Sequence, residues 1–262
     1  MLGTGSAAAK NCYNTCFVFT ENNQHFLTDA GGGNQILKRL DQNNINLGDI
    51  GHIFITHSHT DHILGAVWLV RMIGQIVNYD GCEKQFNIYC HDEAAEALKT
   101  ICYATLPKSI TNHFGGKIKI NILNDGDTCD ILNCKVKFFD IKSDKTKQFG
   151  FVMTSADNKK IVCCGDEPLK EDMFDIADGC DLLMHEAFCL YSERDIFKPY
   201  QKFHSTAKDA CETAEKINAK TVLLYHTEDT HLLNRKELYI AEGQNYYHGN
   251  ILVPDDNESI EI

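Results

Sequence analysis

Apolar residues in the first half of the chain fall into short runs separated by segments of helical periodicity. The short runs predict strands at residues 17–19, 26–28 and 53–55. Apolar residues from Ile36 to Leu40 recur at helical spacing, and the glycines at 31–33 separate that helix from the strand before it. Residues 63–73 are apolar almost throughout, which predicts a buried helix, whereas residues 92–106 predict an amphipathic one.

The second half of the chain is richer in strands. The predicted strands are residues 118–122, 136–139, 149–154, 161–164 and 221–225, and the predicted helix is residues 207–217. Two strand-rich halves, each with helices, predict an α/β fold in which two mixed sheets pack face to face with helices outside. The 262 residues contain no linker, low-complexity tract or short repeat, so we expect a single domain spanning residues 1–262.

The composition narrows the class of protein. Asp and Glu outnumber Lys and Arg by 37 to 25, a formal net charge of −12, which works against strong binding of duplex nucleic acid. The 12 cysteines are scattered through apolar segments without the spacing of a disulfide framework, which predicts reduced thiols. No signal-peptide core and no apolar stretch of ~20 residues stands out, so we expect a soluble, cytoplasmic protein that does not bind membranes. The sequence leaves open whether the chain forms a homodimer.

Four potential metal ligands stand close together directly after a predicted strand: His57, His59, Asp61 and His62. Imidazoles at alternate positions of an extended turn can converge on one cation, and an Asp-His pair at the start of the next helix points toward a second. A merely structural strand-to-helix turn needs one polar capping residue and not three imidazoles. The cluster therefore predicts a metal centre.

The pattern His-x-His-x-Asp-His after a short strand resembles the signature of the metallo-β-lactamase superfamily. The rest of the chain resembles the ribonuclease Z-like phosphodiesterase branch of that superfamily, beginning with the strand and turn at residues 2–6. The further matching positions, in chain order, are Asp29, Asp166, the block His185-Glu186-Ala187, His204 and His226. The resemblance implies an αββα sandwich with metal ions at one edge.

Carried over position by position, the resemblance implies a site for one or two divalent metals, with zinc expected and manganese or iron as alternatives. It implies one metal held by His57 and His59, another held by Asp61, His62 and His226, and a bridging carboxylate, Asp166. Asp29 is implied to orient a ligand histidine. Two cations ~3.5–4 Å apart would lower the pKa of a shared water and neutralise a phosphoryl oxygen. The implied catalytic residues are Asp61, which orients the nucleophile, and His204, which protonates the leaving oxygen.

The chain departs from the family pattern at one expected ligand. The first metal should receive a third histidine from the segment before residue 149, and our alignment puts Lys142 there. A protonated lysine has no lone pair, so it cannot ligate a cation and would be repelled by one. The alternatives are that Asp140, Ser143 or Asp144 substitutes, that the first metal binds weakly or not at all, or that an inward-pointing Lys142 fills its place beside Asp166.

The remaining polar groups predict no second site. The lysines at positions 135, 137, 142, 145 and 147 favour a solvated strand face over a phosphate site. Histidines without a partner at ligand spacing are interpreted as structural or exposed, namely His25, His52, His91, His113, His231 and His248.

These features together favour a metal-dependent hydrolase, and within that class a phosphodiesterase acting on a small or flexible ester such as a cyclic nucleotide or a short RNA end. The tRNA-processing members of the branch carry a long basic arm, and the segment from Lys142 to Asp166 is too short to hold one. The alternatives are a thioester or lactone hydrolase of the same fold, and a non-catalytic binding module whose metal site is impaired at Lys142.

Overall fold

The computed structural model describes residues 1–79 and 82–262 of the chain. In this part of the chain the strands form a five-stranded sheet, ordered β1-β2-β3-β4-β5, and a seven-stranded sheet, ordered β12-β11-β10-β9-β8-β7-β6. The strands of the first sheet are β1 (Phe17–Glu21), β2 (Gln24–Thr28), β3 (Ile50–Phe54), β4 (Phe86–Cys90) and β5 (Ile118–Ile122). Those of the second are β6 (Thr128–Ile131), β7 (Cys134–Asp140), β8 (Phe149–Thr154), β9 (Lys160–Cys163), β10 (Leu182–Glu186), β11 (Thr221–Tyr225) and β12 (Asn250–Leu252).

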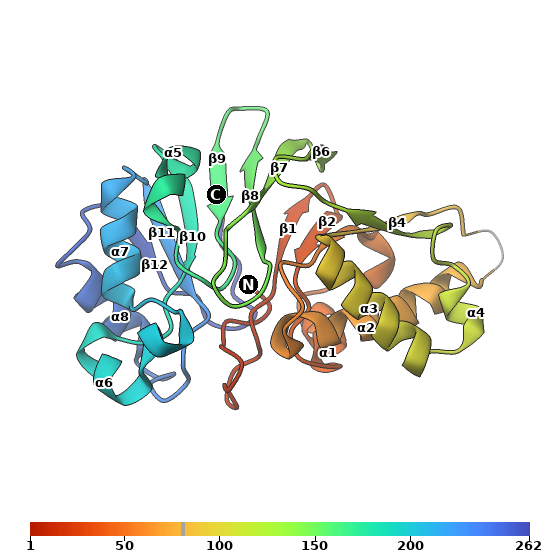
Figure 1. Ribbon diagram of the computed structural model, residues 1–262, viewed down its shortest axis with the longest axis horizontal. Coiled ribbons are helices and arrows are strands. Elements are labelled where there is room, and N and C mark those ends of the chain that lie inside the picture. Colours follow the sequence, from red (N-terminus) through yellow and green to blue (C-terminus); the bar gives the residue numbers. More distant parts are fainter. Residues whose placement is uncertain (80–81) are drawn as a thin grey trace.

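Helices cover the outer faces of both sheets, as Figure 1 shows. The first sheet carries α1 (Gln35–Gln42), α2 (Thr60–Val77), α3 (Asp92–Thr105) and α4 (Lys108–Thr111), and the second carries α5 (Phe174–Ala177), α6 (Arg194–Phe197), α7 (Ala207–Lys216) and α8 (Arg235–Gly243). The predicted αββα sandwich of two mixed sheets is therefore confirmed.

Alternation along the strands builds the three apolar layers of the sandwich. Neighbouring strand residues point to opposite faces, so Phe26 and Phe54 enter the layer between the sheets, whereas Leu27 and Ile53 pack against the helices. Aromatic side chains fill the middle layer, and the rings of Phe54 and Phe138, from opposite sheets, have centroids 5.0 Å apart. The core therefore consists of apolar side chains from end to end of the sandwich.

Strand direction decides where polar side chains gather. Strands β2 to β5 are parallel to one another, and so are β9 to β12. The carboxyl ends of parallel strands meet at one edge of a sheet, and the residues that follow them lie in loops at that edge. Asp29 follows β2, His57 follows β3, Asp166 follows β9 and His226 follows β11, so the fold collects these four residues from distant parts of the chain.

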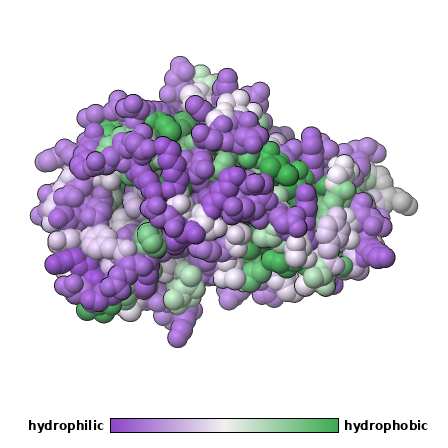
Figure 2. All heavy atoms as spheres, viewed as in Figure 1, coloured by the Kyte–Doolittle hydropathy of each residue, from purple (hydrophilic) through white to green (hydrophobic). Residues whose placement is uncertain are grey.

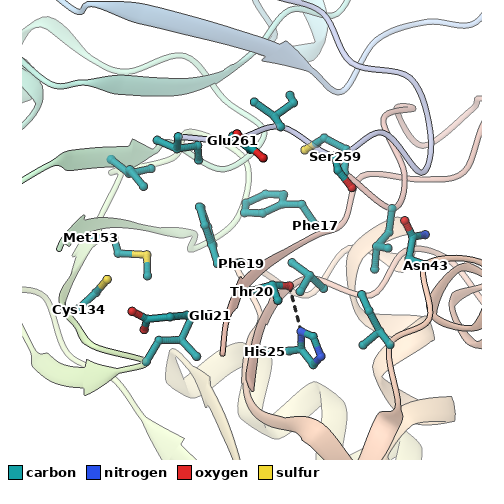
Figure 3. A pocket seen from close by; sticks show the side chains of 18 of the residues that line it. Phe17, Phe19, Thr20, Glu21, His25, Asn43, Cys134, Met153, Ser259 and Glu261 are labelled. Atoms are coloured by element: carbon teal, nitrogen blue, oxygen red, sulfur yellow. Dashed lines mark hydrogen bonds between the residues drawn. The ribbon is translucent and has the colours of Figure 1, made fainter. Parts of the chain in front are cut away.

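The opposite edge of the sandwich holds a cavity of about 1020 Å³ with both apolar and polar side chains in its lining. Its lining includes Phe17, Phe19 and Met153, together with the end of the chain around Glu261 (Figure 3). The strand residues that line it near His25 belong to the beginning of β2 and not to its carboxyl end. None of the residues predicted to hold metal lines this cavity.

Hydrophilic residues predominate on one face of the molecule, in keeping with the acidic composition (Figure 2). The face shown in Figure 2 is covered mainly by hydrophilic residues, with scattered apolar patches. Within residues 1–79 and 82–262, no helix combines the length and the apolar character that crossing a bilayer requires.

Candidate metal centre

The histidine cluster lies where β3 gives way to α2. After Phe54 the chain stays extended through His59, which is the N-cap residue of α2, and Asp61 lies in the first helical turn. An acidic residue is favoured there because the helix dipole places positive charge at its N-terminus. Helix α2 also approaches the loop after β2 closely, since the amide of Gly65 donates to the carbonyl of Gly31 at 2.8 Å. This contact brings Asp29 beside the cluster.

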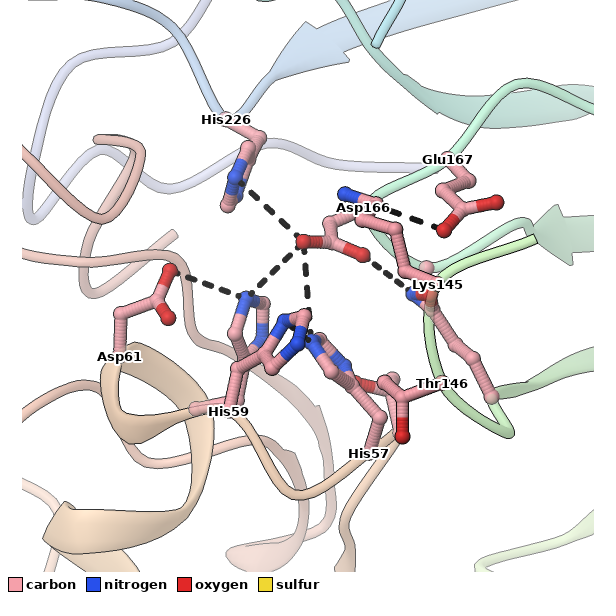
Figure 4. A network of polar contacts seen from close by, with 12 residues as sticks. His57, His59, Asp61, Lys145, Thr146, Asp166, Glu167 and His226 are labelled. Carbon is pink, nitrogen blue, oxygen red and sulfur yellow. Dashed lines mark hydrogen bonds and ion pairs between the residues drawn. The ribbon is translucent and has the colours of Figure 1, made fainter. Parts of the chain in front are cut away.

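One carboxylate oxygen is the point on which the imidazoles converge. Oδ2 of Asp166 lies 3.7 Å from Nε2 of His57, 3.7 Å from Nε2 of His62 and 3.6 Å from Nε2 of His226 (Figure 4). The other oxygen, Oδ1, accepts a hydrogen bond from the buried side-chain amide of Gln148. Asp166 is thereby held with one oxygen turned toward three nitrogen atoms.

The structure assembles the predicted residues into sets of the size and composition that metals require. Among the predicted residues, ligating atoms within 4.8 Å of one another occur in three sets: His57, His59 and Asp166; Asp61, His62 and His226; and Asp166, His204 and His226. The first two sets correspond to the two metal positions that the family resemblance implies. All the predicted site residues therefore lie together at one edge of the sandwich.

Asp29 orients one of the imidazoles. Its Oδ2 accepts a hydrogen bond from Nδ1 of His62 at 2.7 Å, and Thr56 donates to both carboxylate oxygens through its amide and its hydroxyl. The opposite ring nitrogen, Nε2 of His62, is buried and has no hydrogen-bond partner among the described residues. Asp29 and His226 both adopt left-handed backbone conformations, with φ of 54° and 59°. Non-glycine residues adopt such angles only where the surroundings hold them, and they concentrate at functional sites.

The protonation states of the cluster suit a cation. Burial lowers the pKa of His57 well below its usual range and that of His226 to about 4, so both rings are neutral and retain a lone pair. Burial alone would raise the pKa of Asp166, but His57, His226 and His62 hold it well below the ordinary carboxyl value. In the same way, the carboxylates Asp61 and Asp29 overcome the effect of burial and raise the pKa of His62.

The neutral imidazoles of His57 and His226, the ionised carboxylates, and a buried Nε2 of His62 that faces Asp61 at 3.3 Å without a hydrogen bond form a donor set that fits divalent zinc, manganese or iron. A metal would displace the proton from a ligand histidine, and the hydrogen bond from Nδ1 to Asp29 leaves Nε2 as the His62 atom that could ligate one. The residues present therefore fit the expected metal.

The hypothesis that Lys142 enters the site is wrong. Its Nζ lies 2.5 Å from Oδ2 of Asp172, and the side chain is 57% exposed. The three expected substitutes do not join the cluster either: Asp140 accepts the amide of Lys142, Ser143 donates to Glu167, and Asp144 pairs with Lys170. In the described part of the chain, Asp166 is therefore the only third residue that joins His57 and His59 in a candidate ligand set.

Two residues near the His57 and His59 side of the site, Lys145 and Gln148, were not predicted from the sequence. Lys145 belongs to the loop between β7 and β8 and not to a solvated strand face, and its Nζ lies 3.8 Å from Oε1 of the buried Glu167. The one available signal was that the alternating pattern ends at Asp140, which leaves Lys145 outside the strand. Gln148 gave no signal, because a single glutamine before an apolar strand is commonplace.

His204 lies beside the cluster, against a buried glutamate. Its ring stacks on Phe188 with centroids 5.1 Å apart and lies 5.2 Å from the ring of His226. Nδ1 of His204 faces Oε2 of Glu186 at 3.6 Å, and neither atom has a hydrogen-bond partner among the described residues. Burial lowers the pKa of His204 to about 3 and raises that of Glu186 well above its usual range. The two groups are thus arranged to share one proton.

An αββα sandwich with this histidine and aspartate set at its carboxyl edge defines a metallo-β-lactamase-fold protein. The comparisons with known proteins agree. The chain belongs to the family described as Anti-Pycsar protein Apyc1, whose model matches residues 1–259.

Individual relatives place the chain near the ribonuclease Z branch. It is 27% identical over 292 aligned positions to Ribonuclease Z of Staphylococcus carnosus, with 94% of this chain and 93% of that protein covered. Solved structures that share the fold include the following two. Human tRNase Z, short form, has a TM-score of 0.75 at 21% identity, covering 100% of this chain and 98% of the other. The metallo-β-lactamase fold protein YhfI from Bacillus subtilis has a TM-score of 0.77 at 15% identity, covering 97% and 94%.

Proposed function

We propose that the chain is a metal-dependent phosphodiesterase that hydrolyses a small phosphodiester, a cyclic nucleotide in preference to a folded RNA. The observation that carries this proposal is the convergence of three imidazoles on Oδ2 of Asp166, which forms a site able to hold adjacent cations. The family match and the relatives named Ribonuclease Z support phosphodiester chemistry over other reactions of the fold.

Each predicted ligand receives a role in this proposal. His57, His59 and Asp166 would hold one cation, and Asp61, His62, His226 and Asp166 would hold the other. Bound there, divalent cations neutralise phosphoryl charge and lower the pKa of the attacking water. Asp61 orients that water, and His204 donates a proton to the leaving oxygen, replenished from Glu186 across the 3.6 Å gap. Lys145 adds positive charge beside Asp166, which favours an anionic substrate.

The size of the substrate is argued from two neighbouring features. The loop between β7 and β8, which lies at the edge of the metal centre, consists of residues 141–148 alone and is too short for an arm that would hold a large RNA. A second cavity, of about 300 Å³, is lined by Lys10, Asn11 and Asn34 and adjoins Gly32, where an added Cβ atom would lie 3.6 Å from Cα of Asp61. A polar cavity of this size suits the base and sugar of one nucleotide.

The test is a substrate panel with metal-loaded protein. The panel contains bis(p-nitrophenyl) phosphate, 3′,5′-cyclic nucleotides, a short RNA, a lactoyl thioester and an acyl lactone, with Asp166→Asn as the inactive control. Hydrolysis of the phosphodiesters with preference for the cyclic nucleotides supports the proposal. Preferential cleavage of the thioester or lactone replaces it with the rival hydrolase. Cleavage of nothing at full metal occupancy identifies a binding module.

A further inference from the structure

A second group of potential metal ligands lies outside the centre around Asp166. Ligating atoms of Glu193, Glu228 and His231 all fall within 4.8 Å of one another. Glu193 closes the short helical turn Tyr191–Glu193, which follows β10, while Glu228 and His231 lie in the loop after β11. The group therefore joins two segments that are distant in the chain. His231, interpreted from the sequence as a histidine without partners, has two carboxylates beside it.

Two carboxylate oxygens in this group are buried without a hydrogen-bond partner among the described residues. They are Oε1 of Glu228, in a residue only 6% exposed, and Oε2 of Glu193. The other oxygen of Glu228 accepts hydrogen bonds from the amide and the hydroxyl of Thr230, at 2.6 and 2.5 Å, which fixes the direction of the free one. Burying a carboxylate oxygen without a partner is costly unless a cation or a donor compensates.

The neighbouring side chains do not supply that compensation. Within residues 1–79 and 82–262, no lysine or arginine forms an ion pair with either glutamate. Arg194 instead lies over the ring of Tyr191 at 4.1 Å, and Arg235 pairs with Asp255 at 3.1 Å. Nε2 of His231 lies 2.8 Å from Oε1 of Glu193, so a charged His231 would balance one carboxylate and leave Glu228 unbalanced. A divalent cation would balance both.

We propose that Glu193, Glu228 and His231 bind one divalent transition-metal ion of the zinc type, at a site separate from the centre around Asp166. One imidazole nitrogen and two carboxylate oxygens are ligands that zinc accepts, with water completing the coordination. The imidazole disfavours calcium and magnesium, which take oxygen ligands. Bound here, the ion ties the segment that carries His204 to the loop that carries His226, and so positions the proton donor.

The chain offers a matched control for the histidine. Nδ1 of His248 lies 2.9 Å from Oε1 of Glu215, an ion-pair geometry close to that of His231 and Glu193. The side chain of His248 is 87% exposed, and no second carboxylate completes a ligand set there among the described residues. Comparing variants at His248 and His231 therefore distinguishes a simple histidine–glutamate ion pair from a metal site.

The experiment measures zinc per chain after saturation and removal of free metal, for the parent protein, Glu228→Gln, His231→Ala and His248→Ala. The first two variants should each hold one zinc fewer per chain than the parent, and His248→Ala the same amount. Asp166→Ala should disable the main centre. The double variant Asp166→Ala/His231→Ala should hold one zinc fewer per chain than Asp166→Ala alone. An anomalous difference map of the zinc-loaded parent, recorded at the zinc edge, should show a peak between Glu193 and Glu228.

Unchanged zinc content in both variants, or an anomalous map with no peak at this position, would overturn the proposal and leave an ion pair. Glu228→Gln keeps the size of the side chain, so a folding failure is expected only of the alanine variant. If both variants fail to fold, the anomalous map of the zinc-loaded parent still shows whether the site binds zinc. Neither readout depends on hydrolytic activity, so the result stands whether or not the phosphodiesterase proposal holds.

Discussion

The side-chain amide of Gln148 donates a hydrogen bond to Oδ1 of Asp166 and leaves Oδ2 to face the imidazoles of the metal centre. Gln148 is itself buried, and the amide of Phe149, the next residue, donates to the carbonyl of Thr56 at 3.0 Å. The direction of the Asp166 carboxylate is therefore set by Gln148, just before strand β8, without any metal.

Replacing this amide should weaken metal binding without removing a ligand. We expect Gln148→Met to lower the affinity for zinc about 10–100-fold, the usual effect of losing a hydrogen bond to a metal ligand. Competition with a chromogenic chelator measures the affinity. Gln201→Met, at an exposed position, is the control. Equal affinities of parent and Gln148→Met would show that Asp166 needs no such support.

Removing a proposed ligand should abolish activity and spare the fold. We expect His62→Ala to eliminate metal-dependent hydrolysis, because the ion loses a ligand that Asp29 holds in place at 2.7 Å. The metal-free melting temperature should change little, since the three apolar layers and not the centre make up the core. Full activity in this variant would refute the site assignment.

The effect of removing the proton donor on the rate of hydrolysis should depend on the leaving group. His204→Ala should slow hydrolysis of esters with poor leaving groups by about 10²–10⁴-fold, the contribution typical of a general acid, and scarcely affect nitrophenyl esters. Glu186→Gln should show the same selectivity more weakly, since it removes the group facing Nδ1 of His204. Equal losses on both substrate classes would mean that His204 has a structural role.

The sequence predicted the elements whose apolar pattern is continuous. Residues 118–122, 149–154 and 221–225 coincide with β5, β8 and β11, and the apolar stretch after His62 lies in α2. It missed the strands β4, β6, β10 and β12 and the helices α4, α5, α6 and α8. Strand β10 is fully buried although it contains the polar residues His185 and Glu186. These residues interrupt the apolar pattern, so the strand was not predicted, because its burial depends on tertiary packing.

The candidate site was predictable to the extent that its ligands follow local motifs. His57 to His62 are close in sequence, and Asp29, Asp166 and His226 are each marked by a preceding strand. Lys145, Gln148 and the group around Glu228 depend on how loops from different strands meet, which no local pattern encodes. The misplacement of Lys142 has the same cause, because its backbone is left-handed, with φ of 56°, and turns the side chain to the surface.

The two cation positions should fill unequally. In the proposed assignment, the set of Asp61, His62 and His226 would have four protein ligands with the shared Asp166, whereas the set around His57 and His59 would have three. Zinc titration should therefore resolve a tighter and a weaker step within the centre. Lys142→His should leave metal content unchanged, because residue 142 points toward Asp172 and away from the centre. A rise in metal content in that variant would restore Lys142 to the position of the missing ligand.

Gly65 is the position where helix α2 comes closest to the loop that carries Asp29. A Cβ atom on Gly65 would lie 1.8 Å from the carbonyl oxygen of Ala30, so either the helix or the loop would have to move. Alanine is favoured over glycine inside a helix by about 1 kcal/mol, but overpacking of a rigid contact costs about 1–3 kcal/mol. The clash should therefore outweigh the gain in helix propensity, and the substitution should be destabilising.

We therefore expect Gly65→Ala to lower the free energy of unfolding, and to weaken zinc binding because Asp29 is displaced from His62. Gly51→Ala, in β3, is the matched control, since a Cβ there would meet no atom within 4 Å. Urea unfolding of the metal-free proteins measures stability, and chelator competition measures zinc affinity. A Gly65→Ala protein as stable as Gly51→Ala, with the zinc affinity of the parent, would show that α2 can shift without disturbing the link between Asp29 and His62.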